Sequence, residues 1–309
     1  MSAELRLGVI GLSPGNGHPY SWSAIFNGYD AAAMEHCGFP VIPRYLEKQR
    51  FPEDAITGAR VTHVWTQNST LSRHIAQAAL IEYVVEHATD MIGQVDAVLL
   101  ARDDAENHRR FAEPFIAAGL PIYIDKPFAH SRQAAIEFLA LGTRPAQIFS
   151  CSALKFAREM LLSRSEIDRI GGIRHISARV PKSWSKYAIH VIDPILKNCG
   201  PIGDIRNVRA RGFGLDGGGT AVSFEWGGDE RTCEIKAFGS EPSPILVTYS
   251  GPKGSIDTQF KDSFSAFRSA LQVFLTDSVR GEVSHAADIV DAMRVLELGV
   301  GVARLHESD

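Results

Sequence analysis

The chain has 309 residues, a length that fits two domains or one large domain and that suffices to bury a core. Its apolar fraction of 45%, charged fraction of 22% and net charge of −4 are ordinary for a globular protein, whereas nucleic-acid binding calls for a basic balance or stripe. No apolar run reaches the roughly 18 residues of a membrane span, and the first residues lack the layout of a signal peptide. We therefore expect no nucleic-acid partner, no membrane partner and no targeting segment.

Cysteine and histidine spacing argues against a metal or redox centre. The four cysteines form no Cys-x-x-Cys pair, and the eleven histidines include no His-Glu-x-x-His. We expect free thiols, a cytoplasmic protein and no metal site. The cysteines are Cys37, Cys151, Cys199 and Cys233.

The first half of the chain alternates predicted strands with predicted helices. This alternation implies βαβ crossovers and a mostly parallel sheet, in which ligands bind at the carboxyl ends of the strands. The predicted strands are 5–11, 39–42, 61–66, 95–100, 121–124 and 147–151, and the predicted helices are 22–36 with a break at 27–30, 72–93, 107–118 and 131–141.

The second half of the chain has a different residue pattern, in which extended runs are separated by glycine-rich turns. This predicts a mainly antiparallel sheet with helices. The change of pattern places a boundary between residues 126 and 151, and we expect domains at 1–127 and 128–309. The predicted strands are 173–180, 205–211, 220–226, 233–237 and 245–249, and the predicted helices are 158–168, 263–277 and 286–306.

A glycine-rich turn lies between the first predicted strand and the first predicted helix. Glycine at this place lets backbone N–H groups approach a pyrophosphate at a helix N-terminus. The spacing departs from Gly-x-Gly-x-x-Gly, so an ordinary strand-to-helix turn is the alternative interpretation. The cofactor-binding residues predicted here are Gly11, Ser13, Gly15, Asn16 and Gly17.

The second predicted strand ends without the acidic residue that would hold a ribose 2′-hydroxyl. Arg44 follows it instead, and it either meets an adenosine 2′-phosphate, stacks on adenine, or is a solvated surface residue. This slightly favours NADP over NAD. Asn68, at the end of the next predicted strand, is also predicted to bind the cofactor.

Asp125-Lys126-Pro127 follows the fifth predicted strand, and His190-x-x-Asp193 comes later in the chain. Together with 96–100 and His108 upstream, and 251–256 and 286–305 downstream, this order resembles the Gfo/Idh/MocA (glucose–fructose oxidoreductase, inositol dehydrogenase) family over nearly the whole chain. The family usually shows Glu-Lys-Pro, of which Asp-Lys-Pro is a conservative variant.

The resemblance implies an α/β fold: an N-terminal Rossmann parallel sheet, followed by an α+β domain with an open, mainly antiparallel sheet. It implies a nicotinamide cofactor, NAD or NADP, and a sugar-like or cyclitol-like substrate. It also implies a homodimer or homotetramer that assembles through the open sheet.

Hydride transfer from an alcohol requires a group that takes the hydroxyl proton. Lys126, at a strand's carboxyl end, is predicted to be that acid or base, and it otherwise binds a loop or the ribose. His190 is predicted to orient the hydroxyl or relay its proton, and it otherwise is a core residue. Asp193, three residues later, shares its helix face and is predicted to bind substrate. Asp125 and Pro127 are assigned with Lys126 to cofactor binding.

The sequence departs from the family where relatives have an aspartate four residues before the histidine. Lys186 stands there, and it either favours an anionic substrate group or points to solvent. Tyr187 is the third predicted catalytic residue, since its phenol supplies a proton. Trp184 and His18 are predicted to bind substrate, although the aromatic segment that follows His18 is equally consistent with a cap on the core.

The leading hypothesis is an NAD(P)-dependent oxidoreductase that moves a hydride to or from a hydroxyl or keto group of a sugar, with a sugar of surface-polysaccharide synthesis as one option. The alternative is a redox-silent NAD(P)-binding sensor or regulatory protein of the same fold. A third hypothesis is a net non-redox reaction on a tightly held cofactor.

Overall fold

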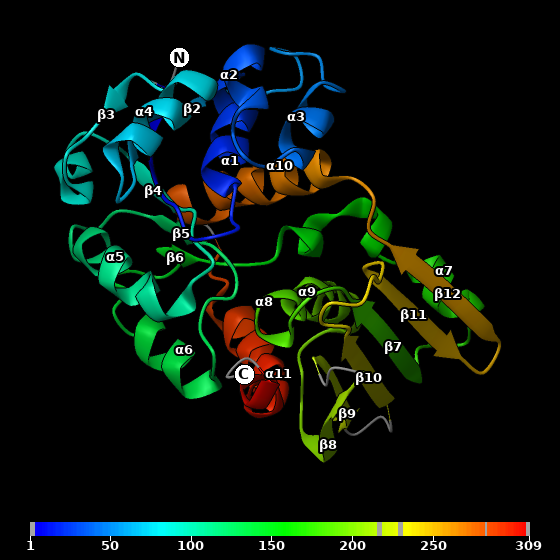
Figure 1. Cartoon of the computed structure of the whole chain (residues 1–309). Coiled ribbons are helices and arrows are strands. Elements are labelled where there is room, and N and C mark those ends of the chain that lie inside the picture. Colours follow the sequence, from blue (N-terminus) through cyan, green and yellow to red (C-terminus); the bar gives the residue numbers. More distant parts are fainter. Residues whose placement is uncertain (1–3, 215–217, 228–230, 282, 307–309) are drawn as a thin grey trace. The chain divides into compact units, whose positions relative to one another are not determined.

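The computed structural model describes residues 4–214, 218–227, 231–281 and 283–306. The chain divides into two compact units, each built from several segments (Figure 1). Unit 1 combines the chain up to Phe128 with Glu137–Ser150 and Ser263–Ala286, and unit 2 holds Ala129–Ile136, Cys151–Asp262 and the remainder from Ala287. The domain division at residue 127 stays a prediction.

Unit 1 contains a sheet of six parallel strands in the order β3-β2-β1-β4-β5-β6. All residues of β4 and β5 are buried, which explains why these strands are continuous apolar runs. Because β1 pairs with β2 on one side and β4 on the other, the strand order reverses there, and a crevice is expected at this switch point. The strands are β1 Leu5–Ile10, β2 Ala59–Trp65, β3 Tyr83–Val84, β4 Ala97–Leu100, β5 Ile122–Ile124 and β6 Ile148–Phe149.

Helices from both ends of the sequence belong to unit 1. Figure 1 shows α10, in orange, next to α1, in blue, and the two helices are in contact. The helix α6, Arg132–Leu139, contains residues of both units. The other helices of unit 1 are α1 His18–Asn27, α2 Ala31–Glu35, α3 Val41–Leu46, α4 Ser69–Ala78, η1 Ala88–Met91, α5 Ala105–Ala117 and α10 Ser263–Val273, which continues into η5 Phe274–Val279.

Two predicted elements of unit 1 are wrong. The predicted strand 39–42 is instead the start of α3, because Pro40 has helical dihedrals (φ −59°, ψ −18°) and Pro43 lies in the first turn, where no N–H is required. The second strand in chain order is therefore β2, which corresponds to the predicted strand 61–66. The predicted helix 72–93 ends at Ala78, and Leu80 has a positive φ of 53°, after which the chain forms β3 and η1.

Unit 2 contains a mixed sheet in the order β12-β11-β7-β10-β9-β8, in which β7 and β10 are parallel and the other pairs are antiparallel. The mainly antiparallel character is as predicted. The hairpin partner β12 was not predicted, since 251–256 was assigned to a turn. The strands are β7 His175–Val180, β8 Ile205–Phe213, β9 Gly219–Trp226, β10 Arg231–Ala237, β11 Leu246–Gly251 and β12 Gly254–Gln259.

The helices of unit 2 are mostly short. The predicted helix 158–168 is instead a 3₁₀ turn followed by α7, which Ser163 and Glu166 cap reciprocally. Within the described residues, no helix has the length and apolar character needed to cross a membrane. All four cysteines are free thiols. The helices are η2 Ala153–Phe156, η3 Arg158–Met160, α7 Arg164–Arg169, α8 Trp184–Tyr187, α9 Ile189–Cys199 and α11 Ala286–His306.

Two glycines of α11 are expected to respond in opposite ways to alanine. A Cβ at Gly299 would lie 2.4 Å from the ring of Trp184, whereas a Cβ at Gly301 would meet nothing within 4 Å. We expect Gly299→Ala to lower the free energy of unfolding by about 1–3 kcal/mol through overpacking. Gly301→Ala should raise it by up to about 1 kcal/mol, because alanine favours helix. Urea unfolding measures both, and equal effects would contradict the packing of Trp184 on α11.

Candidate functional site

Six polar side chains gather at the carboxyl ends of β1, β4 and β5, beside the switch point of unit 1. We call them the switch-point cluster. Ser13, Asn16 and His18 follow β1, Asp103 follows β4, and Asp125 and Lys126 follow β5. All are buried except His18, whose side chain is 18% exposed. Buried polar groups need partners, and the cluster supplies them internally.

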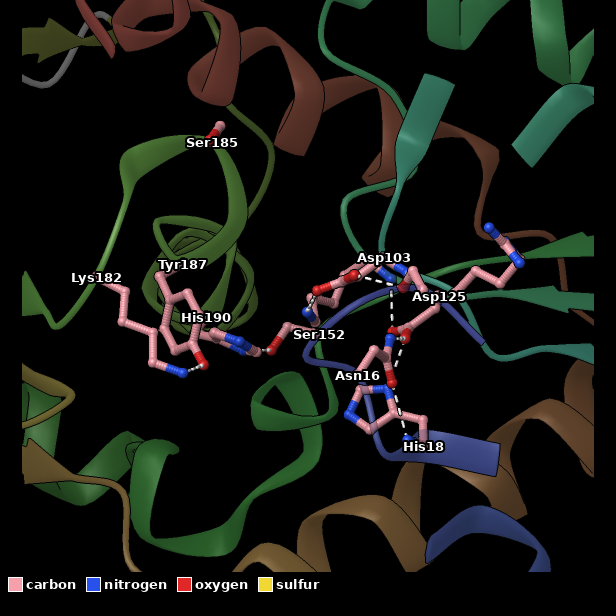
Figure 2. Close-up of polar contacts among 12 residues, drawn as sticks. Asn16, His18, Asp103, Asp125, Ser152, Lys182, Ser185, Tyr187 and His190 are labelled. Carbon is pink, nitrogen blue, oxygen red and sulfur yellow. Dashed lines mark hydrogen bonds and ion pairs between the residues drawn. The ribbon is translucent and has the colours of Figure 1, made fainter. Parts of the chain in front are cut away.

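Asp125 is the centre of one half of the cluster. Its carboxylate accepts hydrogen bonds from Nδ2 of Asn16 (2.7 Å), from the backbone N–H of Lys126 (2.7 Å) and from Nδ1 of His18 (2.5 Å) (Figure 2). Burial raises the pKa of this carboxyl, but the charges of His18 and Lys126, with the hydrogen bonds of His18 and Asn16, lower it to about 2. Asp125 is therefore a buried anion at neutral pH.

Asp125→Asn is expected to reduce stability in a pH-dependent way. The pKa of Asp125 is depressed in the folded chain, so its contribution is present above the unfolded value of 3.8 and is lost as the pH falls toward 2. At neutral pH the variant should lose about 2 kcal/mol of unfolding free energy. The difference from wild type should shrink between about pH 4 and pH 2.

Urea unfolding over a pH series measures this effect. The control is Asp168→Asn, which removes a carboxylate that is 61% exposed and should change stability by less than about 0.5 kcal/mol throughout. A pH-independent loss in Asp125→Asn would show that the carboxylate does not act through its charge.

Asp103 is the centre of the other half. Its Oδ1 accepts a hydrogen bond from the hydroxyl of Ser13 (2.7 Å), and its backbone N–H donates to the same hydroxyl (3.0 Å). Its Oδ2 lies 3.6 Å from Nζ of Lys126, and both side chains are less than a tenth exposed. The turn after β1 is thus tied to β4, and the ammonium of Lys126 is fixed beside a carboxylate.

The glycines of the turn have different reasons to be glycine. A Cβ at Gly11 would lie 2.3 Å from Pro19, and one at Gly17 would lie 2.6 Å from Ile42, so packing within the protein requires both. Gly15 has a φ of +80° and open space around it. Its backbone is therefore accessible to a ligand.

Counted from Gly11, the second and third glycine positions of Gly-x-Gly-x-x-Gly are Ser13 and Asn16. Their side chains are bound to Asp103 and Asp125 respectively. Where the motif has glycines without side chains, this chain has side chains that bind other residues of the protein.

The backbone N–H groups at the N-terminus of α1 decide whether this end of the helix can bind a pyrophosphate. The N–H of His18 donates to Oδ1 of Asn16 (2.8 Å), Pro19 has no N–H, and the N–H of Tyr20 donates to the carbonyl of Gly17 (3.1 Å). The first turn of this helix therefore does not serve a pyrophosphate. The exposed part of the turn is the Pro14–Gly15 segment, next to the cluster.

Arg102 and Gln67 fix the same turn from β4 and β2. The amide of Gln67 donates to the carbonyl of Leu12 (2.6 Å) and accepts from its N–H (3.2 Å). Arg102 binds Asp104 through two bonds (2.9 and 2.6 Å) and also donates to the carbonyl of Leu12. Its guanidinium lies 4.6 Å from the ring centre of Phe111. Burial raises the pKa of Asp104, but its bonds with Arg102 lower it below its usual range.

Arg44 was predicted to follow the second strand of the sheet. It lies instead on α3, where it is exposed, because residues 39–42 do not form a strand. The preference for NADP therefore loses its premise. Asn68 caps α4, accepting from the N–H groups of Thr70 and Leu71. The cofactor roles of both residues stay predictions.

In unit 2, the side chains of His190 and Asp193 both lie against Ser152. Nδ1 of His190 is 2.8 Å from the hydroxyl of Ser152, and the carboxylate of Asp193 accepts from the N–H of Ser152 (2.5 Å) (Figure 2). The two residues thus share one face of α9, as their spacing predicts. Ser152 is fully buried, and its contact with Nδ1 fixes the plane of the His190 imidazole.

Tyr187 lies beside His190, with ring centres 5.2 Å apart. Its hydroxyl accepts a hydrogen bond from Nζ of Lys182 (2.6 Å), and Figure 2 shows this pair next to His190. Lys186 is half-buried on α8. Trp184 is 1% exposed, and its indole N–H donates to the carbonyl of Leu296 in α11 (2.8 Å).

Sequence reasoning assigned no role to two partners of the predicted residues, Ser152 and Lys182, because they are common polar residues without a local pattern. Asp103 carries a signal, because it is an acidic residue just after a strand of a parallel sheet.

No family model matches this chain, and no curated protein matches it in sequence. Solved structures match it along nearly its whole length. At 13–15% identity these likenesses establish the fold. The predicted architecture, a parallel Rossmann-type sheet followed by an open and mostly antiparallel sheet, is confirmed.

Three of these structures illustrate the likeness. A scyllo-inositol dehydrogenase from Lactobacillus casei with bound NAD(H) and scyllo-inositol has a TM-score of 0.69 at 14% identity and 97% coverage of both chains. A myo-inositol 2-dehydrogenase from Lactobacillus plantarum has a TM-score of 0.70 at 15% identity and 97% coverage of both. A UDP-N-acetylglucosamine 3-dehydrogenase from Acidithiobacillus ferrooxidans has 0.67 at 15% identity and 98% coverage of both.

Proposed function

We propose that this chain is an NAD(P)-dependent oxidoreductase that transfers a hydride to or from a hydroxyl or keto group of a sugar or sugar derivative. The observation that carries the proposal is the switch-point cluster, in which Lys126 and Asp125 lie buried at the end of β5. Ligands of parallel sheets bind at this place. The fold, shared with inositol and sugar-nucleotide dehydrogenases, supports the same function.

In unit 1 the turn 11–17 and the end of β5 hold the dinucleotide, which supplies the site that accepts or donates a hydride. Gly15 offers its open backbone, while Asn16 and Ser13 keep the turn in place through Asp125 and Asp103. The ammonium of Lys126 binds the reacting oxygen and stabilises the negative charge that develops on it. NAD and NADP are both compatible with these contacts.

In unit 2 we assign His190 and Tyr187 to catalysis, and Asp193, Lys186 and Trp184 to substrate binding. Ser152 orients the imidazole of His190. Lys182 donates to the phenol oxygen of Tyr187, which leaves the phenol hydrogen to be donated to substrate. Trp184 acts from the core, by fixing α8 against α11.

A homodimer or homotetramer that assembles through the open sheet, and a cytoplasmic location, belong to the same proposal. Sedimentation of the purified chain tests the first, and fractionation of cells tests the second. A monomer at micromolar concentration would contradict the assembly.

Dinucleotide binding is the first test of the function. We expect at least one of NAD, NADH, NADP and NADPH to raise the unfolding midpoint, with about 2.7 kcal/mol of stabilisation at 100 times the dissociation constant. Nicotinamide absorbance then reports turnover with scyllo-inositol, myo-inositol and UDP-N-acetylglucosamine as probes. No shift with any of the four dinucleotides would overturn the proposal.

Two observations favour a second candidate, a redox-silent NAD(P)-binding sensor or regulatory protein. The first N–H groups of α1 are used within the protein, and Lys186 replaces an acid that relatives carry. Dinucleotide binding without turnover of any sugar would support this candidate. Steady turnover with one sugar would eliminate it.

A further inference from the structure

The imidazole of His18 contacts three side chains of unit 1, namely those of Asp125, Trp22 and Phe267. Its Nδ1 lies 2.5 Å from Asp125, and its backbone N–H is held by Asn16 (Figure 2). The ring stacks on Trp22, with centres 4.9 Å apart and planes 14° apart, and meets the edge of Phe267, with centres 4.9 Å apart. These contacts fix both the position and the plane of the imidazole.

Asn16 couples the backbone of His18 to its acceptor. Its Oδ1 accepts from the N–H of His18, while its Nδ2 donates to Asp125 at 2.7 Å. One amide therefore sets the distance between the start of α1 and the end of β5. Asn16 therefore holds the backbone of His18 and the carboxylate of Asp125 in position for their pairing.

Asp125 determines which nitrogen of His18 exchanges protons. The carboxylate is an anion at neutral pH and accepts hydrogen bonds only, so Nδ1 keeps its hydrogen whether the imidazole is neutral or charged. Nε2 is the ring nitrogen that is not bound to Asp125. It is therefore the nitrogen that gains and loses the proton.

We propose that His18 is the proton acceptor for the substrate hydroxyl and that Asp125 is the positioning residue that holds it; this rests on the function proposed above. The substrate O–H bond breaks and an Nε2–H bond forms on His18. The electron pair of the O–H bond forms the carbonyl, while a hydride leaves the same carbon for an acceptor of the nicotinamide class. The reverse reaction returns the proton from His18 to the alkoxide oxygen.

The cluster stabilises the charge that this step creates. The imidazolium of His18 forms against the carboxylate of Asp125, which is 1% exposed, and burial of the carboxylate strengthens the attraction. Lys126 has a different environment, because its ammonium is bound to Asp103 at 3.6 Å. It serves as a cation at the reacting oxygen, while His18 takes the proton.

The first arm of the test is proton NMR of the whole chain without dinucleotide. An imidazole N–H bound to a carboxylate gives a strongly deshielded proton signal. We expect one such signal to vanish in both His18→Gln and Asp125→Asn and to persist in His285→Gln. The control is matched, since Nε2 of His285 lies 2.8 Å from Asp277 within the same unit. A His18 signal that survives in Asp125→Asn would overturn the pairing.

The second arm is turnover with a sugar that the wild-type chain oxidises. We expect His18→Gln to lower kcat by about 100- to 10,000-fold. The thermal shift with dinucleotide should persist, and His285→Gln should match wild type. The charged group that contacts His18 within the described residues is Asp125, so the pH profile should lose the limb of one base. In His18→Ala, added imidazole should restore part of the turnover.

The outcomes separate this proposal from the proposed function. Turnover by His18→Gln within threefold of wild type overturns the role of His18 and leaves the oxidoreductase standing. Absence of turnover by the wild-type chain overturns both. If dinucleotide raises the unfolding midpoint of the wild-type chain but not that of His18→Gln, His18 is a binding residue and its role as proton acceptor is overturned.

Discussion

Lys126→Met is expected to lower kcat by roughly 100- to 1,000-fold, because it removes the cation that stabilises the developing negative charge on the substrate oxygen. The methionine keeps most of the volume of the buried stem. A thermal shift with dinucleotide should persist, since the turn 11–17 is held through other contacts. Stopped-flow and steady-state measurements with the same sugar check the result.

Asp103 complicates the interpretation of that variant, because Lys126→Met leaves its carboxylate buried beside Ser13 without a cation. The double variant Lys126→Met/Asp103→Asn removes both charges. We expect it to recover the stability lost in the single variant while turnover stays low. Lys236→Met, which breaks a half-exposed pair with Glu234, is the control and should keep full activity. Recovery of turnover in the double variant would show that Lys126 acts only by neutralising Asp103.

Arg102→Ala is expected to lower the free energy of unfolding by about 3–5 kcal/mol, the usual cost of breaking a buried ion pair. The side chains of Arg102 and Asp104 are only 7% and 12% exposed, so the variant leaves a buried carboxylate without its cation. It also removes the bond to Leu12 and the stacking on Phe111. Urea unfolding measures the loss.

An exposed pair of the same chemistry provides the comparison for Arg102. Arg6 and Asp96 form an ion pair at 3.2 Å, but their side chains are 51% and 35% exposed. Arg6→Ala should therefore cost less than about 1 kcal/mol. In Arg102→Ala/Asp104→Asn the stability should return in part. Similar losses in the two single variants would contradict the argument from burial.

The parallel sheet was predictable because its strands are apolar runs that end in glycine-rich or acidic segments. The run at 39–42 looks the same in sequence, and only its prolines, which suit the first turn of a helix, distinguish it. This one error displaced Arg44 from a strand end to a helix. Short apolar runs carry too little periodicity to separate strand from helix.

The candidate site was predictable where a motif identified it and not where it depends on distant partners. Asp125 and Lys126 follow from Asp-Lys-Pro, and His18 from its place after the glycine turn. The pairing of His18 with Asp125 joins residues 107 positions apart, and only the strand order brings them together. Trp184, predicted to bind substrate, donates its indole N–H to α11, and its substrate role stays a prediction because aromatic side chains near a site and in a core look alike in sequence.

The discontinuous make-up of unit 1 has a consequence for synthesis on the ribosome. The strand β6 and the helix α10 belong to this unit but are translated after Phe128, and α10 is made almost last. Phe267, which packs on the edge of His18, comes from that helix. A nascent chain that has emerged only as far as residue 127 therefore lacks one edge of the sheet and one of the rings that contact His18. The imidazole of His18 reaches its final surroundings only when nearly the whole polypeptide has emerged.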